Sequence, residues 1–115
     1  MLRGEIWEVD LEPVRGNEAN KRRPAVIVSN DRANATASRL GRGVVTVVPV
    51  TSNTDKVYPF QVLLSATQSG LAFDSKAQGE QIRSVSTIRL LNRIGRLSPA
   101  ELEELDDALR LHLEL

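Results

Sequence analysis

The sequence contains no cysteine, a single histidine and few aromatic residues. Without cysteine, the chain cannot form disulfides, use a thiolate nucleophile or build a cysteine-based zinc site. The one histidine, His112, lies near the C-terminus, so a mechanism with two histidines has no support within one chain, and neither has a Ser-His-Asp triad. Aromatic residues make up 3% of the chain, which argues against an extended platform for stacked bases, although Tyr58 and Phe60 could stack one base.

Other patterns are missing as well. No apolar run approaches the roughly 20 residues of a membrane span, and the N-terminus lacks the apolar core of a signal peptide. The expectation is therefore a cytoplasmic protein with no membrane partner. No phosphate-binding G-x-x-x-x-G-K-[ST] segment occurs, and no His, Asp and Glu cluster has metal-ligand spacing. We expect no metal and no cofactor.

The net charge of zero conceals two oppositely charged parts. Residues 1–97 carry 14 lysines and arginines against 9 acids, a net charge of +5, whereas residues 98–115 carry one arginine against 6 acids, a net charge of −5. A basic body can hold a polyanion, and the acidic tail would face elsewhere. The length of 115 residues predicts a single domain, residues 1–115.

Short apolar or alternating runs separated by turn residues predict a β-rich body, residues 1–97. The predicted strands are Gly4–Leu11, Ala25–Ser29, Val44–Val50, Phe60–Leu64, Leu71–Phe73, Glu80–Val85 and Leu90–Leu97. A long polar loop at 11–23 and turns at 51–59 and 67–70 connect them. The class is mainly β, a small and strongly curved antiparallel sheet or barrel.

Two helices are expected. Asn30 or Asp31 can cap a short helix that ends before Gly41 and Gly43. The stretch SPAELEELDDALRLHLEL predicts a C-terminal helix, residues 98–115, because Ser98 and Glu101 form a capping box around a proline at the first helical position. Its last leucines fall partly off the apolar stripe and predict contact with a second surface, in the same chain or in a partner.

Three polar stretches could carry chemistry. In the first, Lys21, Arg22 and Arg23 precede Pro24, which restricts Arg23 to extended geometry. A guanidinium on a constrained backbone is a good bidentate clamp for phosphate, although consecutive cations often only solvate a surface. Glu18, five residues earlier, could form an ion pair or act as a general base.

The second stretch is VVPVTSNT, residues 47–54, and the third is KAQGEQIRSVS, residues 76–86. Thr51 and Ser52 follow a strand end, where their hydroxyls could bind a phosphate oxygen or simply form a turn. Gln81 and Arg83 alternate with Ile82, so they are predicted to share one strand face, either solvated or binding.

These stretches, in order, resemble the MazF (PemK-like) toxins of toxin–antitoxin systems. The segments that carry the resemblance are RGEIWEVDLEP, the following G-x-E, RRPAVIVS, VVPVTS, YPFQVLLS and EQIRSVS. The resemblance runs from Arg3 to Leu97 and extends loosely into the terminal helix. It implies an SH3-like barrel with a C-terminal helix, a homodimer, and metal-independent, sequence-selective cleavage of single-stranded RNA. The products would be a 2′,3′-cyclic phosphate or 3′-phosphate end and a 5′-hydroxyl. A MazE-type antitoxin would block the RNA groove.

The resemblance also implies roles for residues. Arg23 matches the family's arginine before Pro-Ala and Thr51 its threonine after the Val-Pro-x stretch, so these two look like the catalytic pair. Glu18 matches a glutamate that matters in some members and is the candidate base. Where some relatives carry an arginine and an aspartate in catalytic roles, this chain has Gln78 and Glu80, and no general acid is assigned. The side chains expected to bind RNA are Lys21, Arg22, Ser52, Lys76, Gln78, Glu80, Gln81 and Arg83.

Two other functions fit the same pattern. A toxin on this scaffold could bind DNA gyrase, towards which only the acidic, leucine-rich tail points. A non-catalytic barrel could bind RNA or protein and would show salt-dependent RNA binding without cleavage.

Overall fold

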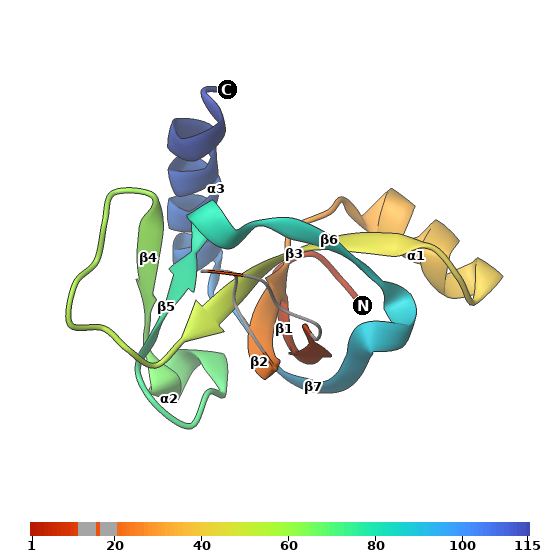
Figure 1. Ribbon diagram of the computed structural model, residues 1–115, viewed down its shortest axis with the longest axis horizontal. Coiled ribbons are helices and arrows are strands. Elements are labelled where there is room, and N and C mark those ends of the chain that lie inside the picture. The colour runs from red at the N-terminus through yellow and green to blue at the C-terminus, as the bar shows by residue number, and fades with distance from the viewer. Residues whose placement is uncertain (12–15, 17–20) are drawn as a thin grey trace.

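The computed structural model describes residues 1–11, 16 and 21–115, and its strands form one strongly twisted antiparallel sheet (Figure 1). The described strands are β1 (Glu5–Asp10), β2 (Arg22–Ile27), β3 (Val44–Thr51), β4 (Gln61–Leu64), β5 (Ser75–Gln78), β6 (Arg83–Ser86) and β7 (Leu90–Arg96). Their order is β4-β5-β3-β2-β1-β7, and β6 also pairs with β3. The sheet curls like a barrel, but no pairing between described residues closes it. The predicted small, twisted antiparallel sheet is confirmed.

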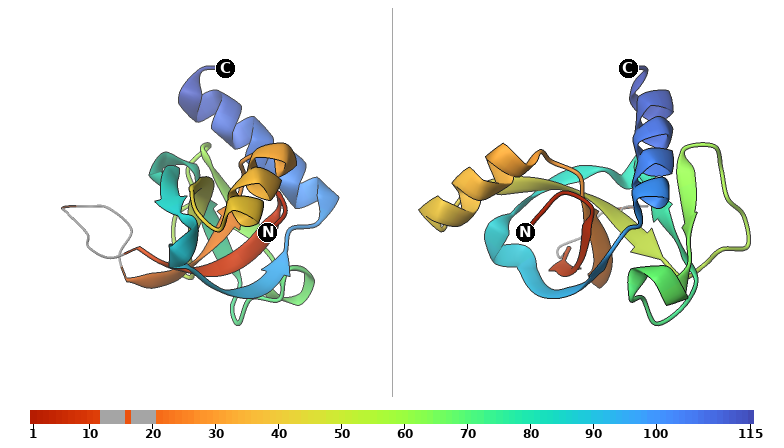
Figure 2. Two further views of the ribbon diagram at one scale, coloured as in Figure 1. Left: turned by 90° about the vertical axis from the view of Figure 1, so that its right-hand side faces the viewer. Right: turned by 180° about the vertical axis from the view of Figure 1, so that it is seen from behind.

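Helices lie around this sheet, as Figures 1 and 2 show. They are α1 (Asp31–Leu40), α2 (Ala66–Ser69) and α3 (Pro99–Leu113), with 3-10 turns η1 (Gly79–Gln81) and η2 (Thr87–Arg89). The predicted caps are confirmed: Asn30 accepts from the Ala33 amide, and Ser98 and Glu101 form the capping box of α3. These side chains satisfy amides that have no partner within their own helix.

The alternation of side chains on β2 and β3 divides the core in two. Val26, Val48 and Val50 belong to a cluster that also contains Leu64 and Leu105, on the α3 side of the sheet. The intervening residues of the same strands, Ala25, Ile27, Val45 and Val47, join the second cluster. That cluster also contains Val9, Leu11 and Val85. Both faces of the central strands are therefore buried, which explains why their sequence reads as an almost continuous apolar run.

The predictions for residues 67–85 were partly wrong. Leu71–Phe73 is not a strand, and the strand begins later, as β5. The predicted turn at 67–70 contains the single helical turn α2, which Gly70 ends with a φ of 84°. Glu80 and Gln81 lie in η1, not in a strand, so Gln81 and Arg83 do not share a strand face. Polar and apolar residues alternate in this segment without a clear period. The position of β5 is therefore set by its pairing with β3 and β4.

The N-terminus is attached to the sheet by Glu5. Burial raises the pKa of its carboxyl group, but hydrogen bonds from the Leu2 amide (2.7 Å) and the Trp7 indole (3.2 Å) lower it, as do the charges of the N-terminus and Arg93. The net result is a pKa below the ordinary value of 4.5. Such a carboxyl group stabilises the folded state when the pH is above the pKa that the group has in the unfolded chain. This contribution is lost as the pH falls through the lower pKa of the folded state.

Glu5→Gln should therefore remove one component of the acid dependence of stability. Wild-type stability should drop as the pH falls below about 4.5 and through the lower folded pKa, whereas the variant should start less stable at neutral pH and lose less. Urea unfolding at a series of pH values measures both effects. The control is Glu103→Gln, on an exposed position of α3. Parallel pH profiles for wild type and Glu5→Gln would contradict this assignment.

Candidate active site

The site begins where the hydrogen-bond ladder between β2 and β3 ends, at Pro24. The Leu11 amide donates to the Lys21 carbonyl (2.8 Å) and the Val28 amide to the Thr46 carbonyl (2.9 Å). In an antiparallel sheet hydrogen-bonded positions alternate, so the odd residues of β2 bond to β1 and the even ones to β3. The nitrogen of Pro24 therefore points towards Val50 but carries no hydrogen to donate. The β2–β3 pairs accordingly stop at Ala25 opposite Pro49.

Beyond that point the two strands take different partners. β2 stays paired with β1 as far as Arg22, whereas β3 pairs with β5 through Val50 and Thr51. Continuing the β2–β3 register by two residues places Arg23 opposite Thr51, and opposite residues of an antiparallel pair share a face. Because no ladder joins them, a ligand has access to both.

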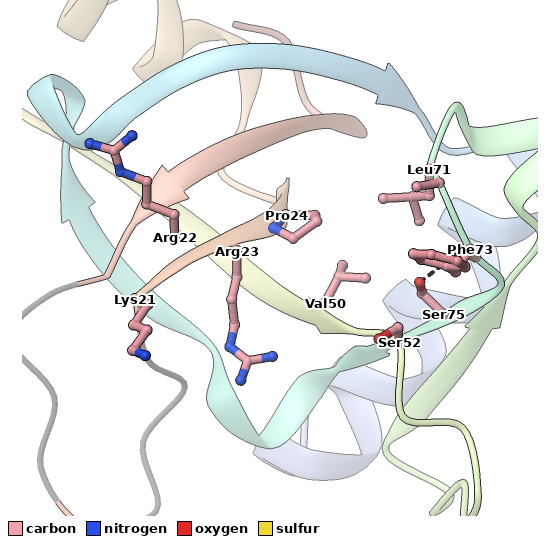
Figure 3. Close-up of a pocket in the computed structure, with 10 residues that line it drawn as sticks. Lys21, Arg22, Arg23, Pro24, Val50, Ser52, Leu71, Phe73 and Ser75 are labelled. Carbon is pink, nitrogen blue, oxygen red and sulfur yellow. Dashed lines mark hydrogen bonds between the residues drawn. The ribbon is translucent and has the colours of Figure 1, made fainter.

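A pocket of about 300 Å³ opens beside these strand ends (Figure 3). Its cationic wall holds three of the predicted residues, Lys21, Arg22 and Arg23, and Ser52 also lines it. The side chains of Arg22 and Arg23 point in opposite directions in Figure 3, as expected for neighbours in a strand. The cation run therefore lies on two faces of β2.

Lys21 turns the chain into β2 with a φ of 56°. A residue other than glycine, asparagine or aspartate rarely adopts this left-handed conformation, which costs about 1 kcal/mol or more. Backbone strain of this kind is enriched at binding sites. The strain at Lys21 supports a functional reading of the cation run.

Thr51 is half-buried at the end of β3, and its Oγ1 accepts a hydrogen bond from the Asn53 amide (3.2 Å). This bond occupies a lone pair of the hydroxyl and orients it, while the hydroxyl proton can donate to an anion. Thr51 is thus the turn residue that the sequence offered as one alternative, and its binding of phosphate stays a prediction.

The segment after Thr51 is fastened to the sheet by buried polar groups. Lys76 is only 8% exposed, and its Nζ donates to the Lys56 carbonyl. Gln61 accepts from the Tyr58 amide (3.1 Å) and donates to Glu80 Oε2 (2.7 Å). Lys76 and Glu80, both predicted to bind RNA, therefore have structural contacts that hold residues 52–60.

The remaining predicted residues of the third stretch lie farther along. Gln78 pairs with Gln61 on β4, and Arg83 pairs with Val47, about 13 Å along β3 from Thr51. Arg83 Nη1 and Glu80 Oε1 are buried without a hydrogen-bond partner among the described residues. Gln81 lies between them in η1. Glu18, the predicted base, lies outside the described residues, as does most of the predicted loop 11–23.

Tyr58 and Phe60, the two aromatic residues that could stack one base, belong to a small group of rings. Tyr58 and Phe60 stack on each other at 5.5 Å, and Phe60 also contacts His112 of α3 at 5.8 Å. Lys56 Nζ lies 4.9 Å from the centre of the Tyr58 ring. This group connects residues 56–60 to the C-terminal helix, and stacking of one base on Tyr58 or Phe60 stays a prediction.

Sequence reasoning missed the apolar half of the pocket. Facing the cations are Pro24, Val50, Leu71, Ala72 and Phe73. The predicted strand at Leu71–Phe73 hid this role, because a strand would have alternated these side chains between core and solvent. The available signal was an aromatic residue in a stretch of glycine, serine and aspartate.

Within the described ranges, no group of three or more His, Asp or Glu side chains could hold a metal ion. In the same ranges, no helix has the length and hydropathy to cross a membrane. Among the described residues that line the pocket, the charged ones are Lys21, Arg22 and Arg23.

A small twisted antiparallel sheet with a cationic pocket at a strand end defines a class of β proteins suited to bind a phosphate chain. Residues 2–113 match the model of the family described as PemK-like, MazF-like toxin of type II toxin-antitoxin system. The chain belongs to this family.

Curated relatives agree with this assignment. The chain is 74% identical to Endoribonuclease MazF9 of Mycobacterium tuberculosis, over 100% of this chain and 98% of that protein. It is 35% identical to Endoribonuclease MazF6 of the same species, over 98% and 96% of the two chains.

Solved structures show the same fold. The crystal structure of MazF from Deinococcus radiodurans superposes with a TM-score of 0.83 at 24% identity and covers 100% of this chain and 97% of that one. A mycobacterial endoribonuclease in complex with its cognate antitoxin superposes with a TM-score of 0.76 at 22% identity, covering 100% and 96%.

Lys76→Met should loosen residues 52–60 without unfolding the protein. Methionine has a similar length and can fill the buried volume, but it cannot donate to the Lys56 carbonyl, and one lost hydrogen bond typically costs about 1 kcal/mol. Hydrogen exchange of the amides in residues 53–60 should accelerate. Arg39→Met, at an exposed position of α1, is the control, because it removes one positive charge outside residues 52–60. Equal exchange in the two variants would show that Lys76 does not hold the segment.

Proposed function

We propose that the Arg23–Thr51 site cleaves single-stranded RNA by attack of a ribose 2′-hydroxyl on the adjacent phosphorus, without a metal ion. The products would be a 2′,3′-cyclic phosphate or a 3′-phosphate and a 5′-hydroxyl. As a member of the MazF-like toxins, the protein is an endoribonuclease toxin of a toxin–antitoxin system. The observation that carries the proposal is the end of the β2–β3 ladder before Pro24, beside a cationic pocket that Arg23 lines. Continuation of the β2–β3 register would put Thr51 opposite Arg23.

In this mechanism Arg23 stabilises the negative charge on the phosphoryl oxygens. In the attack, negative charge builds on the phosphoryl oxygens, and preorganised donors aimed at such charge usually make the largest contribution to catalysis. The planar guanidinium presents two parallel N–H groups to a phosphate, on a strand whose position is fixed by β1. Thr51 donates its hydroxyl proton to the same phosphoryl group.

Proton transfer involves other groups. Glu18 is the proposed base for the 2′-hydroxyl, on the family resemblance. Arginine has a pKa above about 12 and is a poor acid, so water is the proposed donor to the leaving oxygen. Because the nucleophile belongs to the substrate, DNA would not be cleaved.

The charge distribution also indicates how the activity is controlled. The cationic wall of the pocket would attract an acidic, extended segment as well as RNA. A MazE-type antitoxin with such a segment would cover Lys21 and Arg22 and exclude the substrate. Both partners would meet the toxin in the cytoplasm.

Arg23→Ala should lower the rate of RNA cleavage about 10²–10³-fold, because removal of one donor to the developing charge typically costs that much. Arg23→Lys should recover only part of it, since an ammonium group lacks the planar fork. The assay follows a fluorescent single-stranded RNA in EDTA, in which wild-type activity should persist. Arg32→Ala, on exposed α1, controls for the loss of one positive charge. Intact RNA after incubation with folded wild-type protein would refute the function.

We also propose that the protein works as a homodimer. A groove of about 660 Å³ runs between α1 and α3, and its apolar lining includes Val44, Leu109, Leu113 and Leu115. Three of these side chains are exposed in a single chain: Val44, Leu113 and Leu115. A contiguous exposed apolar surface of this kind is typical of a protein interface. A second copy of the chain, with the RNA groove between the subunits, would cover it.

Leu113→Glu should therefore convert a dimer into a monomer at micromolar concentration, because it places a charge in the apolar contact. Sedimentation velocity measures the change. Leu63→Glu, which alters an equally apolar exposed position on β4 outside this groove, should leave the dimer intact. A wild-type monomer at these concentrations would contradict the proposal.

A further inference from the structure

The pocket at the strand ends has two chemically different walls. One carries Lys21, Arg22 and Arg23, and the other consists of the apolar residues Pro24, Val50, Leu71, Ala72 and Phe73 (Figure 3). A phosphate needs only the first wall. A cavity of about 300 Å³ with an apolar wall is at the lower end of small-molecule sites and suits a flat, apolar-faced ligand attached to an anion.

Phe73 is the notable group on the apolar wall because its side chain is 69% exposed. Its backbone is nevertheless held: the Ser75 hydroxyl donates to the Phe73 carbonyl (2.8 Å), and Asp74 accepts from the Ala66 amide (2.9 Å). An aromatic ring that faces solvent from an anchored backbone gains little for folding, but it is pre-positioned to stack on a ligand.

Strand alternation places the residues around this pocket, Arg23 included, on two faces of the strands. By the β2–β3 register, Pro24 lies opposite Val50 and Arg22 opposite Ser52, on one face of the strands. Arg23 and Thr51 occupy the other face. A single-stranded chain that passes over the strand ends can therefore place one phosphate on the Arg23 face and a neighbouring base on the Phe73 face.

We propose that this pocket binds one unpaired base of the RNA next to the cleaved bond, stacked on Phe73, while a cation of the opposite wall holds the phosphate attached to it. The Ser52 hydroxyl can bond to the edge of that base, so the pocket is a specificity-determining subsite. This assignment rests on the proposed ribonuclease activity. An acidic peptide could use the same cations, but the flat exposed ring and the single small pocket favour a nucleotide.

The test combines a protein variant with an altered substrate. Short RNAs containing the cleavage sequence are prepared with one abasic nucleotide at each position in turn, and kcat/KM is measured for each. Wild type should lose about 10- to 100-fold at one position beside the cut, the range expected for loss of one base stacked on an aromatic ring. Phe73→Ala should lose a similar factor on intact RNA and show little further loss with that abasic substrate.

Controls separate stacking from a structural effect. Phe73→Trp should restore most of the activity, whereas Ile88→Ala, which removes an equally exposed apolar side chain outside the pocket, should cleave like wild type. The proposal would be overturned if, at every abasic position, the fold losses in kcat/KM from Phe73→Ala and from the missing base multiplied independently. The proposal would also be overturned if Phe73→Ala cleaved RNA as fast as wild type. This includes the case in which Phe73→Ala changes only the inhibition by an acidic peptide. Both results require an active wild type, so they differ from failure of the ribonuclease function, in which wild type cuts nothing.

Discussion

The missing backbone hydrogen of Pro24 is the constraint on which the site depends. In β2 and the residue after it, positions 24, 26 and 28 face β3 with their backbone hydrogen-bonding groups. At Pro24 the donor is absent. The neighbouring Pro49 lies where β3 changes its other partner from β6 to β5, so its missing donor also falls at a break. Two prolines thus occur within paired strands at the points where pairing stops, as the chemistry of proline requires. The strand ends separate there, and the cations and hydroxyls at those ends become accessible.

The rigidity of the site comes from buried polar contacts rather than from regular structure. Residues 52–60 form no strand, and side chains from β4 and β5 bond to their backbone instead. Gly79 shows how tightly this region is packed, since a Cβ there would lie 2.4 Å from the Phe60 carbonyl oxygen. A buried polar network of this kind is costly when incomplete, so it favours one arrangement of the segment.

The acidic tail is kept apart from the basic site by the fold itself. Glu101 is 7% exposed, with one carboxylate oxygen on the Ser98 amide (3.0 Å) and the other on the Ser65 amide (3.2 Å). Asp106 pairs with Arg3 at the N-terminus. Two of the tail's acids therefore have structural partners, and α3 packs mainly against β4 and η1 rather than against β2. Segregation of charge lets a formally neutral chain present a cationic pocket.

The sequence by itself determined the features whose signals are local. The capping box at Ser98, the cap at Asn30 and the β-branched run of β3 were predictable because they depend on residues within a few positions of one another. The order of motifs also led to the prediction that Arg23 and Thr51 form the catalytic pair. Only the tertiary structure decided that Arg22 and Arg23 face opposite ways, that Lys76 is buried against Lys56, and that Phe73 lines the pocket. These features depend on strand pairing between residues distant in sequence, and the mixed polarity of residues 67–85 is compatible with more than one pairing. Lys76 is buried because of the register in which β5 pairs with β3. The sequence of β5 alone does not predict that register.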